Sequence, residues 1–229
     1  MWEAIEIDDH ATVAELVKSG FPPESTRPFG NESLLQYAYE KNAKQAFAVL
    51  ANADCGVEMQ LRDGTQIIHR VAYDKDPFWL QTLVESGADV DAWSNGRGNR
   101  EGSPIHFAII EGCQDNGVFL LESGACIDCP SNQFSSTAFF HAVNHYQWKV
   151  ATRMLQLGAD PEHGPFGKRV VDALKQRDLD SERSFMEGFP QFVYELKKTG
   201  HGKEVFQGSL WTKKSYEDFL SEGEALSPK

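Results

Sequence analysis

One position recurs through this chain at an almost constant interval. At each occurrence an apolar segment with helical spacing is followed by glycine or, once, by aspartate, and successive occurrences lie 34, 33, 37 and 34 residues apart. The residue after a helix often adopts a left-handed conformation, which glycine reaches without steric cost. Aspartate is among the other residues that tolerate it. The recurring residues are Gly20, Asp54, Gly87, Gly124 and Gly158.

A second landmark keeps the same register. Sixteen residues before each of the last four positions lies a small or β-branched residue that ends a short motif. These motifs are Ser33 to Ala38, Gln66 to Val71, Ser103 to Ala108 and Thr137 to Ala142. Ala4 holds the same place relative to Gly20, so the chain begins inside a first helix. Two landmarks in one register indicate a tandem repeat of about 33 residues.

The best-preserved motif is Ser103-Pro104-Ile105-His106-Phe107-Ala108, which resembles the T-P-L-H-x-A signature of ankyrin repeats. The resemblance covers about residues 1–200. It implies an all-α fold, an ankyrin-repeat solenoid of stacked helix-turn-helix units with β-turn fingers between them. The signature proline survives only at Pro104, and the histidine only at His69 and His106. The repeats are therefore divergent, with no close consensus from which a function could be carried over.

The repeat boundaries predict an ankyrin-repeat domain of residues 1–200 and a C-terminal tail of residues 201–229. The expected units are about 1–29, 30–62, 63–99, 100–133 and 134–166, followed by a degenerate C-terminal cap at 167–200. Within the cap we expect a longer second helix over residues 185–198 that stops at Gly200. We expect the tail to pack back on this cap, and residues 221–229 to be frayed.

Composition limits the classes of partner. Hydrophobic residues make up 41% of the chain and charged residues 24%, as in ordinary soluble domains, and the net charge is −12. This charge argues against nucleic acid or an anionic membrane as the partner and suits a basic protein, although acidity also simply maintains solubility. Without a membrane-length apolar run or a signal-peptide pattern, we expect a cytoplasmic protein that is monomeric when free.

The sequence predicts no catalytic, cofactor or metal site. The family resemblance implies that His69 and His106 hydrogen-bond the turns. His141 and His145 share a helix face, but the H-E-x-x-H signature is absent. Cys126 and Cys129 form a lone C-x-x-C without the second pair that structural zinc needs, so we expect ordinary reduced cysteines.

The same resemblance implies that a partner binds to the first helices and the turn tips. It places one residue of each first helix, directly before the small residue, in an exposed row. Tyrosine and arginine are frequent in interface hot spots. The row consists of Tyr37, Arg70, Phe107 and His141, and His145 lies one turn beyond His141. The alternative for Tyr37 and Phe107 is that they pack between neighbouring repeats.

Turn tips extend this candidate surface. The longest, residues 93–102, carries Trp93, Arg97 and Arg100, and planar guanidinium groups suit carboxylates on a partner. A tolerated surface insertion is the alternative. Arg62 and Phe134 belong to two other tips.

These features predict a module that binds and occludes a partner protein and is not an enzyme. The sharper hypothesis is a resemblance to bacterial ankyrin-type immunity proteins, which neutralise a cognate toxin; it is motivated by acidity, size and the lack of catalytic motifs. The alternative is a regulatory scaffold or host-directed effector that links two proteins.

Overall fold

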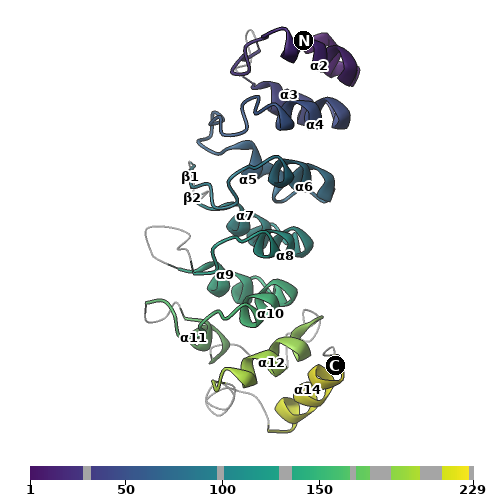
Figure 1. Cartoon of the computed structure of the whole chain (residues 1–229). Coiled ribbons are helices and arrows are strands. Elements are labelled where there is room, and N and C mark those ends of the chain that lie inside the picture. Colours follow the sequence, from purple (N-terminus) through teal and green to yellow (C-terminus); the bar gives the residue numbers. More distant parts are fainter. Residues whose placement is uncertain are drawn as a thin grey trace. The chain divides into compact units, whose positions relative to one another are not determined.

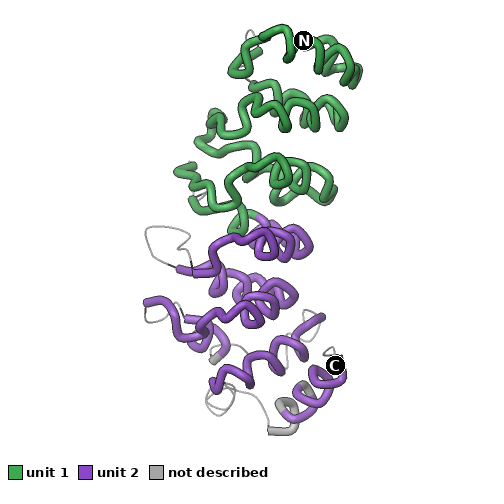
Figure 2. The backbone as a smooth tube through the Cα atoms, viewed as in Figure 1, with its two compact units in different colours: residues 1–107 green, residues 108–229 purple. Residues whose placement is uncertain are grey.

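The structure is a computed structural model of the whole chain, and it describes residues 1–27, 32–96, 101–128, 136–165, 169–175, 187–201 and 213–226. Short α-helices follow one another in pairs along the sequence (Figure 1). The chain divides into two compact units, residues 1–107 and residues 108–229 (Figure 2). No helix in the described part is both long enough and apolar enough to cross a membrane.

The described part of unit 1 contains three helix pairs and a small hairpin. The pairs are α1 (Trp2–Glu6) with α2 (His10–Lys18), α3 (Leu34–Glu40) with α4 (Lys44–Asn52), and α5 (Ile67–Val71) with α6 (Pro77–Glu85). Strands β1 (Ser94–Asn95) and β2 (Glu101–Gly102) pair antiparallel, with Ser94 opposite Gly102. Helix α7 (Pro104–Ile110) runs across the division between the units.

Unit 2 continues the pattern and ends in a modified pair. The helices in its described residues are α8 (Gln114–Glu122), α9 (Ala138–Asn144), α10 (Trp148–Gln156), α11 (Val170–Lys175), α12 (Phe189–Lys198) and α14 (Lys213–Leu226). Around α10 and α12 the core is aromatic, because the Trp148 ring lies 4.6 Å from that of Phe189 and 5.2 Å from that of Phe192, between centroids.

The recurring helix stops are left-handed, as predicted. The φ angles of Gly20, Gly87, Gly124 and Gly158 lie between +88° and +94°, and Asp54 has a φ of +52°. Each of these residues therefore ends the second helix of a pair, and aspartate takes this conformation in place of glycine in the second repeat.

A second set of left-handed residues was not predicted. Asp8, Asn42, Gly112 and Tyr146 have φ between +54° and +80° and join the first helix of a pair to the second. The third repeat instead begins α6 with the Asp76 side chain, which accepts from the Phe78 amide, and a proline in the first turn. Because the residue type differs at each of these turns, the sequence carried no common signal for them.

Residues of the preceding repeat cap some second helices. The Asp8 carboxylate accepts hydrogen bonds from the backbone amides of Ala46 (2.8 Å) and Gln45 (3.3 Å) at the start of α4. Neither α4 nor α10 has a side-chain cap at its own N-cap residue. At α10 the side chain of Gln114 accepts from the Lys149 amide at 3.0 Å. Neighbouring repeats are thus joined by hydrogen bonds as well as by apolar contacts.

The C-terminal helix packs against the cap. As expected for the cap, α12 is followed by Gly200 with a φ of +88°, but the helix begins at Phe189 and not at residue 185, because Gly188 before it is left-handed with a φ of +82°. Helix α14 contacts α12, and Gly223 lies so close that an added Cβ would collide with the carbonyl oxygen of Pro190. The expectation of a frayed end at residues 221–229 is wrong for residues 221–226, since packing on α12 keeps them helical. Trp211 lies outside the described residues.

The cysteines differ in state. Cys55 and Cys113 are thiols, whereas Cys126 is disulfide-bonded, so the expectation of reduced cysteines is wrong for Cys126. Burial is the first cause that raises the pKa of the Cys55 thiol above its ordinary value, and this holds the group protonated at neutral pH. Cys129 lies outside the described residues.

Candidate functional site

The signature histidines hold turns together, as the resemblance implied. His69 is fully buried; its Nδ1 accepts from the Gln66 amide at 3.1 Å, and its Nε2 donates to the Ala92 carbonyl at 2.9 Å. Burial lowers the pKa of His69 below its ordinary value, which keeps the ring neutral for these two roles. In the next repeat His106 Nδ1 accepts from the Ser103 amide at 3.2 Å. These histidines organise the turns that carry the candidate surface.

The predicted exposure of Tyr37 and Phe107 is wrong. Their exposed fractions are only 2% and 7%. The Tyr37 ring meets the edge of Trp2 at 5.4 Å and lies beneath the Arg27 guanidinium at 4.7 Å, and the Phe107 ring packs on His69 at 5.0 Å. The alternative, packing between neighbouring repeats, therefore describes both rings.

The other members of the row are more accessible. Arg70 and His141 are half-buried, and His145 is exposed. The ring centroids of His141 and His145 are 6.1 Å apart, and His141 Nε2 lies 3.0 Å from the Ser136 hydroxyl. Across the described residues, no three or more histidine, cysteine, aspartate or glutamate side chains gather in a metal-binding arrangement.

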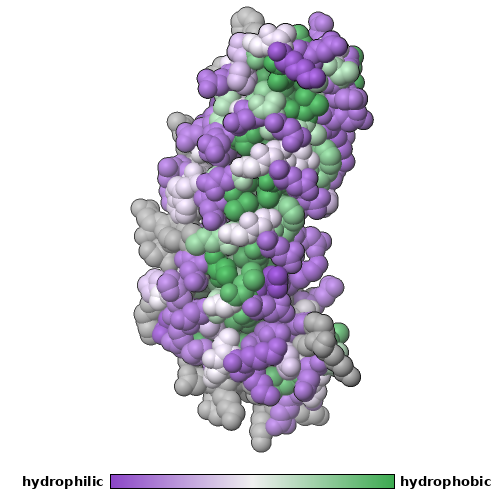
Figure 3. All heavy atoms as spheres, viewed as in Figure 1, coloured by the Kyte–Doolittle hydropathy of each residue, from purple (hydrophilic) through white to green (hydrophobic). Residues whose placement is uncertain are grey.

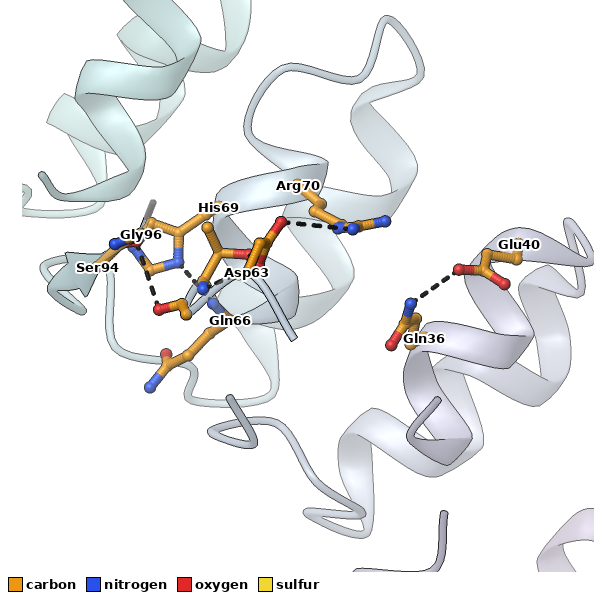
Figure 4. A network of polar contacts seen from close by, with 10 residues as sticks. Gln36, Glu40, Asp63, Gln66, His69, Arg70, Ser94 and Gly96 are labelled. Carbon is orange, nitrogen blue, oxygen red and sulfur yellow. Dashed lines mark hydrogen bonds and ion pairs between the residues drawn. The ribbon is translucent and has the colours of Figure 1, made fainter. Parts of the chain in front are cut away.

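Figure 4 shows two groups of polar side chains in unit 1, one on α3 and one on α5 and the turn before it. We call Gln36, Glu40, Asp63 and Arg70 the α3–α5 face. The Gln36 amide donates to the Glu40 carboxylate at 2.8 Å, and an Arg70 guanidinium nitrogen lies 3.5 Å from the Asp63 carboxylate. Each of these side chains is thus held by a neighbour on the same face.

Further polar contacts adjoin the α3–α5 face. The Tyr39 hydroxyl donates to Asp74 at 2.5 Å, and burial first and this carboxylate second raise the pKa of Tyr39 far above its ordinary value. Lys41 and Glu6 form an ion pair at 2.5 Å between the first and second repeats. The hydrogen bond and electrostatic attraction to Lys41 lower the pKa of the Glu6 carboxyl, which therefore stays charged to lower pH.

The finger between the third and fourth repeats presents an aromatic side chain. Trp93 is 40% exposed, and its Nε1 donates to the Asn95 side chain at 3.0 Å. The Gly96 amide donates to the Ser94 hydroxyl at 3.0 Å, which stabilises the turn at the end of β1. Arg62, in the preceding tip, is exposed. Arg97, Arg100 and Phe134 lie outside the described residues, so their predicted roles stay predictions.

Apolar atoms are also visible on the surface of each unit. Figure 3 shows them in patches bordered by hydrophilic atoms on the face turned to the viewer. The large apolar side chains that are exposed in the described part are Ile7, Trp93, Ile110, Leu157 and Leu226. Single exposed apolar residues are ordinary. Trp93 differs because a hydrogen bond fixes its orientation at the edge of a structured finger.

Known proteins share this architecture. No family model matches the chain. Over 100 residues it is 31% identical to the B-cell lymphoma 3 protein homolog of Mus musculus, an alignment that covers 43% of this chain and 22% of that protein. The match thus spans about a fifth of the length of this curated relative.

Solved structures match over most of the chain. The ankyrin repeat domain of Bcl-3 has a TM-score of 0.66 at 19% identity, with 96% of each chain covered. The human ASB11 ankyrin repeat domain has a TM-score of 0.60 at 19% identity, covering 100% of this chain and 98% of that one. An ankyrin repeat domain from Acinetobacter baumannii AYE has a TM-score of 0.64 at 16% identity, covering 81% and 94%. Together with the recurring signature, these matches show that the chain has the fold of an ankyrin-repeat protein.

Proposed function

We propose that this chain binds another protein through the α3–α5 face and the finger that carries Trp93. Ankyrin repeats are protein–protein interaction modules, and the chain has their fold. The observation that carries the proposal is the ordered set of polar side chains in unit 1, each already held by a neighbour. Side chains fixed before association lose little conformational entropy on binding.

The partner we propose is a basic protein. The net charge of −12 attracts a positively charged protein over long distances and accelerates its encounter with this chain. Glu40 and Asp63 offer carboxylates to lysine or arginine, while Trp93 and Arg62 supply aromatic and cationic contacts at the tips. Rigid coverage of a functional face of the partner would block it by occlusion, without any chemistry on this chain.

A sharper form of the proposal is a cytoplasmic immunity protein that neutralises a basic toxin. Its support is the charge, the fold and the ready-made binding face. Co-expression with a candidate toxin encoded beside this chain should restore growth, and the variants below should abolish the rescue. A chain that fails to protect against every neighbouring toxin would contradict this form and leave general protein binding untouched.

The alternative is a scaffold that links two proteins. It requires two separable binding faces, and the tail of residues 201–229 is one candidate for the second face. Helix α14 is packed on α12, so its contacting face is occupied by the chain itself. A scaffold would therefore need a second face elsewhere on the repeats.

Capture from the lysate of the native cell tests the proposal. We would compare the tagged wild type with Glu40→Lys combined with Trp93→Ala, at low and high salt. Glu15→Lys is the control, since Glu15 is an exposed carboxylate on α2, outside the α3–α5 face. Circular dichroism would verify that each variant is folded.

One stoichiometric basic partner, lost in the double variant, retained in the control and weakened by salt, is the expected result. Binding that is unaffected by the double variant would place the interface elsewhere.

A further inference from the structure

An open groove of about 450 Å³ lies in unit 2, on second helices rather than on the first helices of the candidate surface. It is lined by α8, by one side of α10 and by the start of α12, which succeed one another in Figure 1. The residues that carry the argument are Lys149, Thr152, Arg153, Glu187, Gly188 and Gln191.

The first of three features is the start of α12. Gly188 is the N-cap residue of this ten-residue helix, with a φ of +82°, and no side chain caps the helix there. Glycine suits the left-handed conformation but has no side chain that could accept from the first turn. The positive end of the helix dipole therefore faces the groove, where it favours an anionic group.

The second feature is Thr152. Its side chain lines the groove and is only 8% exposed, and its hydroxyl has no hydrogen-bond partner. A buried hydroxyl without a partner costs about 1–3 kcal/mol, so native structures usually satisfy it. Rotation about χ1 by one staggered step moves the hydroxyl to the position that the methyl group held. An acceptor bound in the groove could thus receive this hydrogen bond.

The third feature is the charge of the lining. Lys149 and Arg153, four residues apart on α10, are its cations, and Glu187 is its carboxylate. Both cations pair with exposed carboxylates beside the groove, Lys149 with Asp115 and Arg153 with Glu122. Exposed ion pairs of this kind contribute little stability, so a ligand carboxylate can share these cations with Asp115 and Glu122 or take the place of those carboxylates. The lining itself thus carries two cations and one carboxylate, and Asp115 and Glu122 beside it balance the cations until a ligand carboxylate takes their place.

We propose that this groove binds a carboxylate on an acidic segment of a protein partner. The backbone amides of Phe189 and Gln191 at the start of α12 and the Thr152 hydroxyl donate to the carboxylate, whereas Pro190 between the two amides has no N–H. Lys149 and Arg153 balance the charge of the carboxylate. The amide side chain of Gln191 also lines the groove and can pair with the peptide backbone of the segment. This site goes beyond the proposed function, because it lies on other helices and selects the opposite charge.

The test uses the full chain and an end-blocked peptide of six glutamates. An end-blocked peptide of six glutamines, which lacks the charges, and inorganic phosphate are the further probes. NMR would follow the backbone amides of Thr152, Arg153 and Gln191 during titration. We would compare the wild type with Lys149→Gln plus Arg153→Gln, and with Thr152→Val. Lys41→Gln plus Lys44→Gln is the matched control, since both are lysines paired with carboxylates in unit 1.

We expect the glutamate peptide to shift these amides and the glutamine peptide to leave them in place. Loss of both cations should weaken binding about tenfold, and the control should not weaken it. Thr152→Val should weaken binding about fivefold without lowering the melting temperature, because the hydroxyl it removes makes no hydrogen bond in the free protein. A purely structural role for Thr152 would leave binding unchanged.

Two results would overturn the proposal. One is an absence of amide shifts with the glutamate peptide, or shifts that the groove variants leave unchanged. The other is that phosphate shifts these amides and the glutamate peptide does not, which would make the groove an anion site that does not accept peptides. Neither result would bear on the proposed face in unit 1.

Discussion

His69 joins two neighbouring turns through one neutral ring. Its Nδ1 accepts from the Gln66 amide, its Nε2 donates to the Ala92 carbonyl, and burial lowers its pKa below the ordinary value of 6.5. A protonated ring would lose the acceptor and carry an unpaired buried charge. The free energy of unfolding therefore depends on pH through this signature histidine.

The first prediction is that stability falls below about pH 6.5. The unfolded chain binds a proton at His69 near its ordinary pKa of 6.5, whereas the folded chain binds it only at lower pH. The contribution of His69 is therefore complete above pH 6.5 and is lost as the pH falls toward its lowered folded pKa. Urea unfolding at pH 7.5 and pH 5.5 measures this difference.

His69→Gln is the matched variant. It should lower the free energy of unfolding by about 1–3 kcal/mol at pH 7.5, because two buried hydrogen bonds are weakened. It should also remove the part of the pH dependence that His69 causes. An equal fall in stability between the two pH values in wild type and variant would show that other groups are responsible.

At the scale of elements, helices are stabilised by residues outside them. The Asp8 carboxylate caps the start of α4, and the side-chain carbonyl oxygen of Gln114 caps the start of α10. Each capping residue belongs to the preceding repeat. At the other end of the chain, α14 adds a helix to α12 through the close approach at Gly223. Such elements depend on their neighbours for boundaries and position, since their own end residues supply no side-chain cap.

The second prediction separates the two roles of Asp8. Asp8→Ala should cost about 2 kcal/mol, since it removes the cap of α4 and places alanine at a φ of +54°. Asp8→Gly should cost less, because glycine tolerates the conformation, and Asp8→Asn should be close to wild type, because it keeps an acceptor. Thermal unfolding gives this order. Equal costs for alanine and asparagine would rule out the cap.

The third prediction concerns the contact between α14 and α12. Gly223→Ala should displace α14, because the added Cβ would collide with Pro190 and lie 2.8 Å from the Cβ of Tyr194. Overpacking of this kind typically costs about 1–3 kcal/mol. Hydrogen exchange of the α14 amides should then accelerate, whereas the neighbouring exposed substitution Glu224→Ala should leave it slow. Unchanged protection in Gly223→Ala would mean that α12 and α14 separate readily without loss of the helix.

At the scale of the whole molecule, helices contact their counterparts in the next repeat. In unit 1, α2 packs on α4 and α4 on α6; in unit 2, α8 packs on α10 and α10 on α12. Stability in such an array is approximately a sum of terms for repeats and for neighbouring pairs. Asp8 acts at the junction of the first two repeats, and His69 acts within the third and at the finger that follows it.

The fourth prediction is therefore additivity. The combined variant Asp8→Ala, His69→Gln should lose the sum of the two single losses to within about 0.5 kcal/mol, because the two residues bond different partners. Equilibrium unfolding of the four proteins at pH 7.5 measures the coupling. A coupling free energy well above this margin would show that interactions in unit 1 extend beyond neighbouring repeats.

Part of the candidate site could not be read from the sequence. The repeat register placed Arg70 and Trp93 correctly at accessible positions, yet it also assigned exposure to Tyr37 and Phe107. Those rings are covered by Trp2 and Arg27 in one case and by His69 in the other. The repeat register predicts the direction in which a side chain points from its own helix. The exposure of that side chain depends on residues elsewhere in the chain that pack over it.

The sequence by itself determined the period and the left-handed helix stops. These follow from local sterics at the end of each helix, so the residue at each position suffices to predict them. The role of the signature histidines came from the family resemblance instead, since His69 bonds the carbonyl of Ala92, 23 residues further along the chain. Only the tertiary structure decided the cap from Asp8 to α4, the helical end at residues 221–226 and the groove beside α12. Each of these depends on the distance between residues far apart in the chain, and that distance is set by packing between repeats.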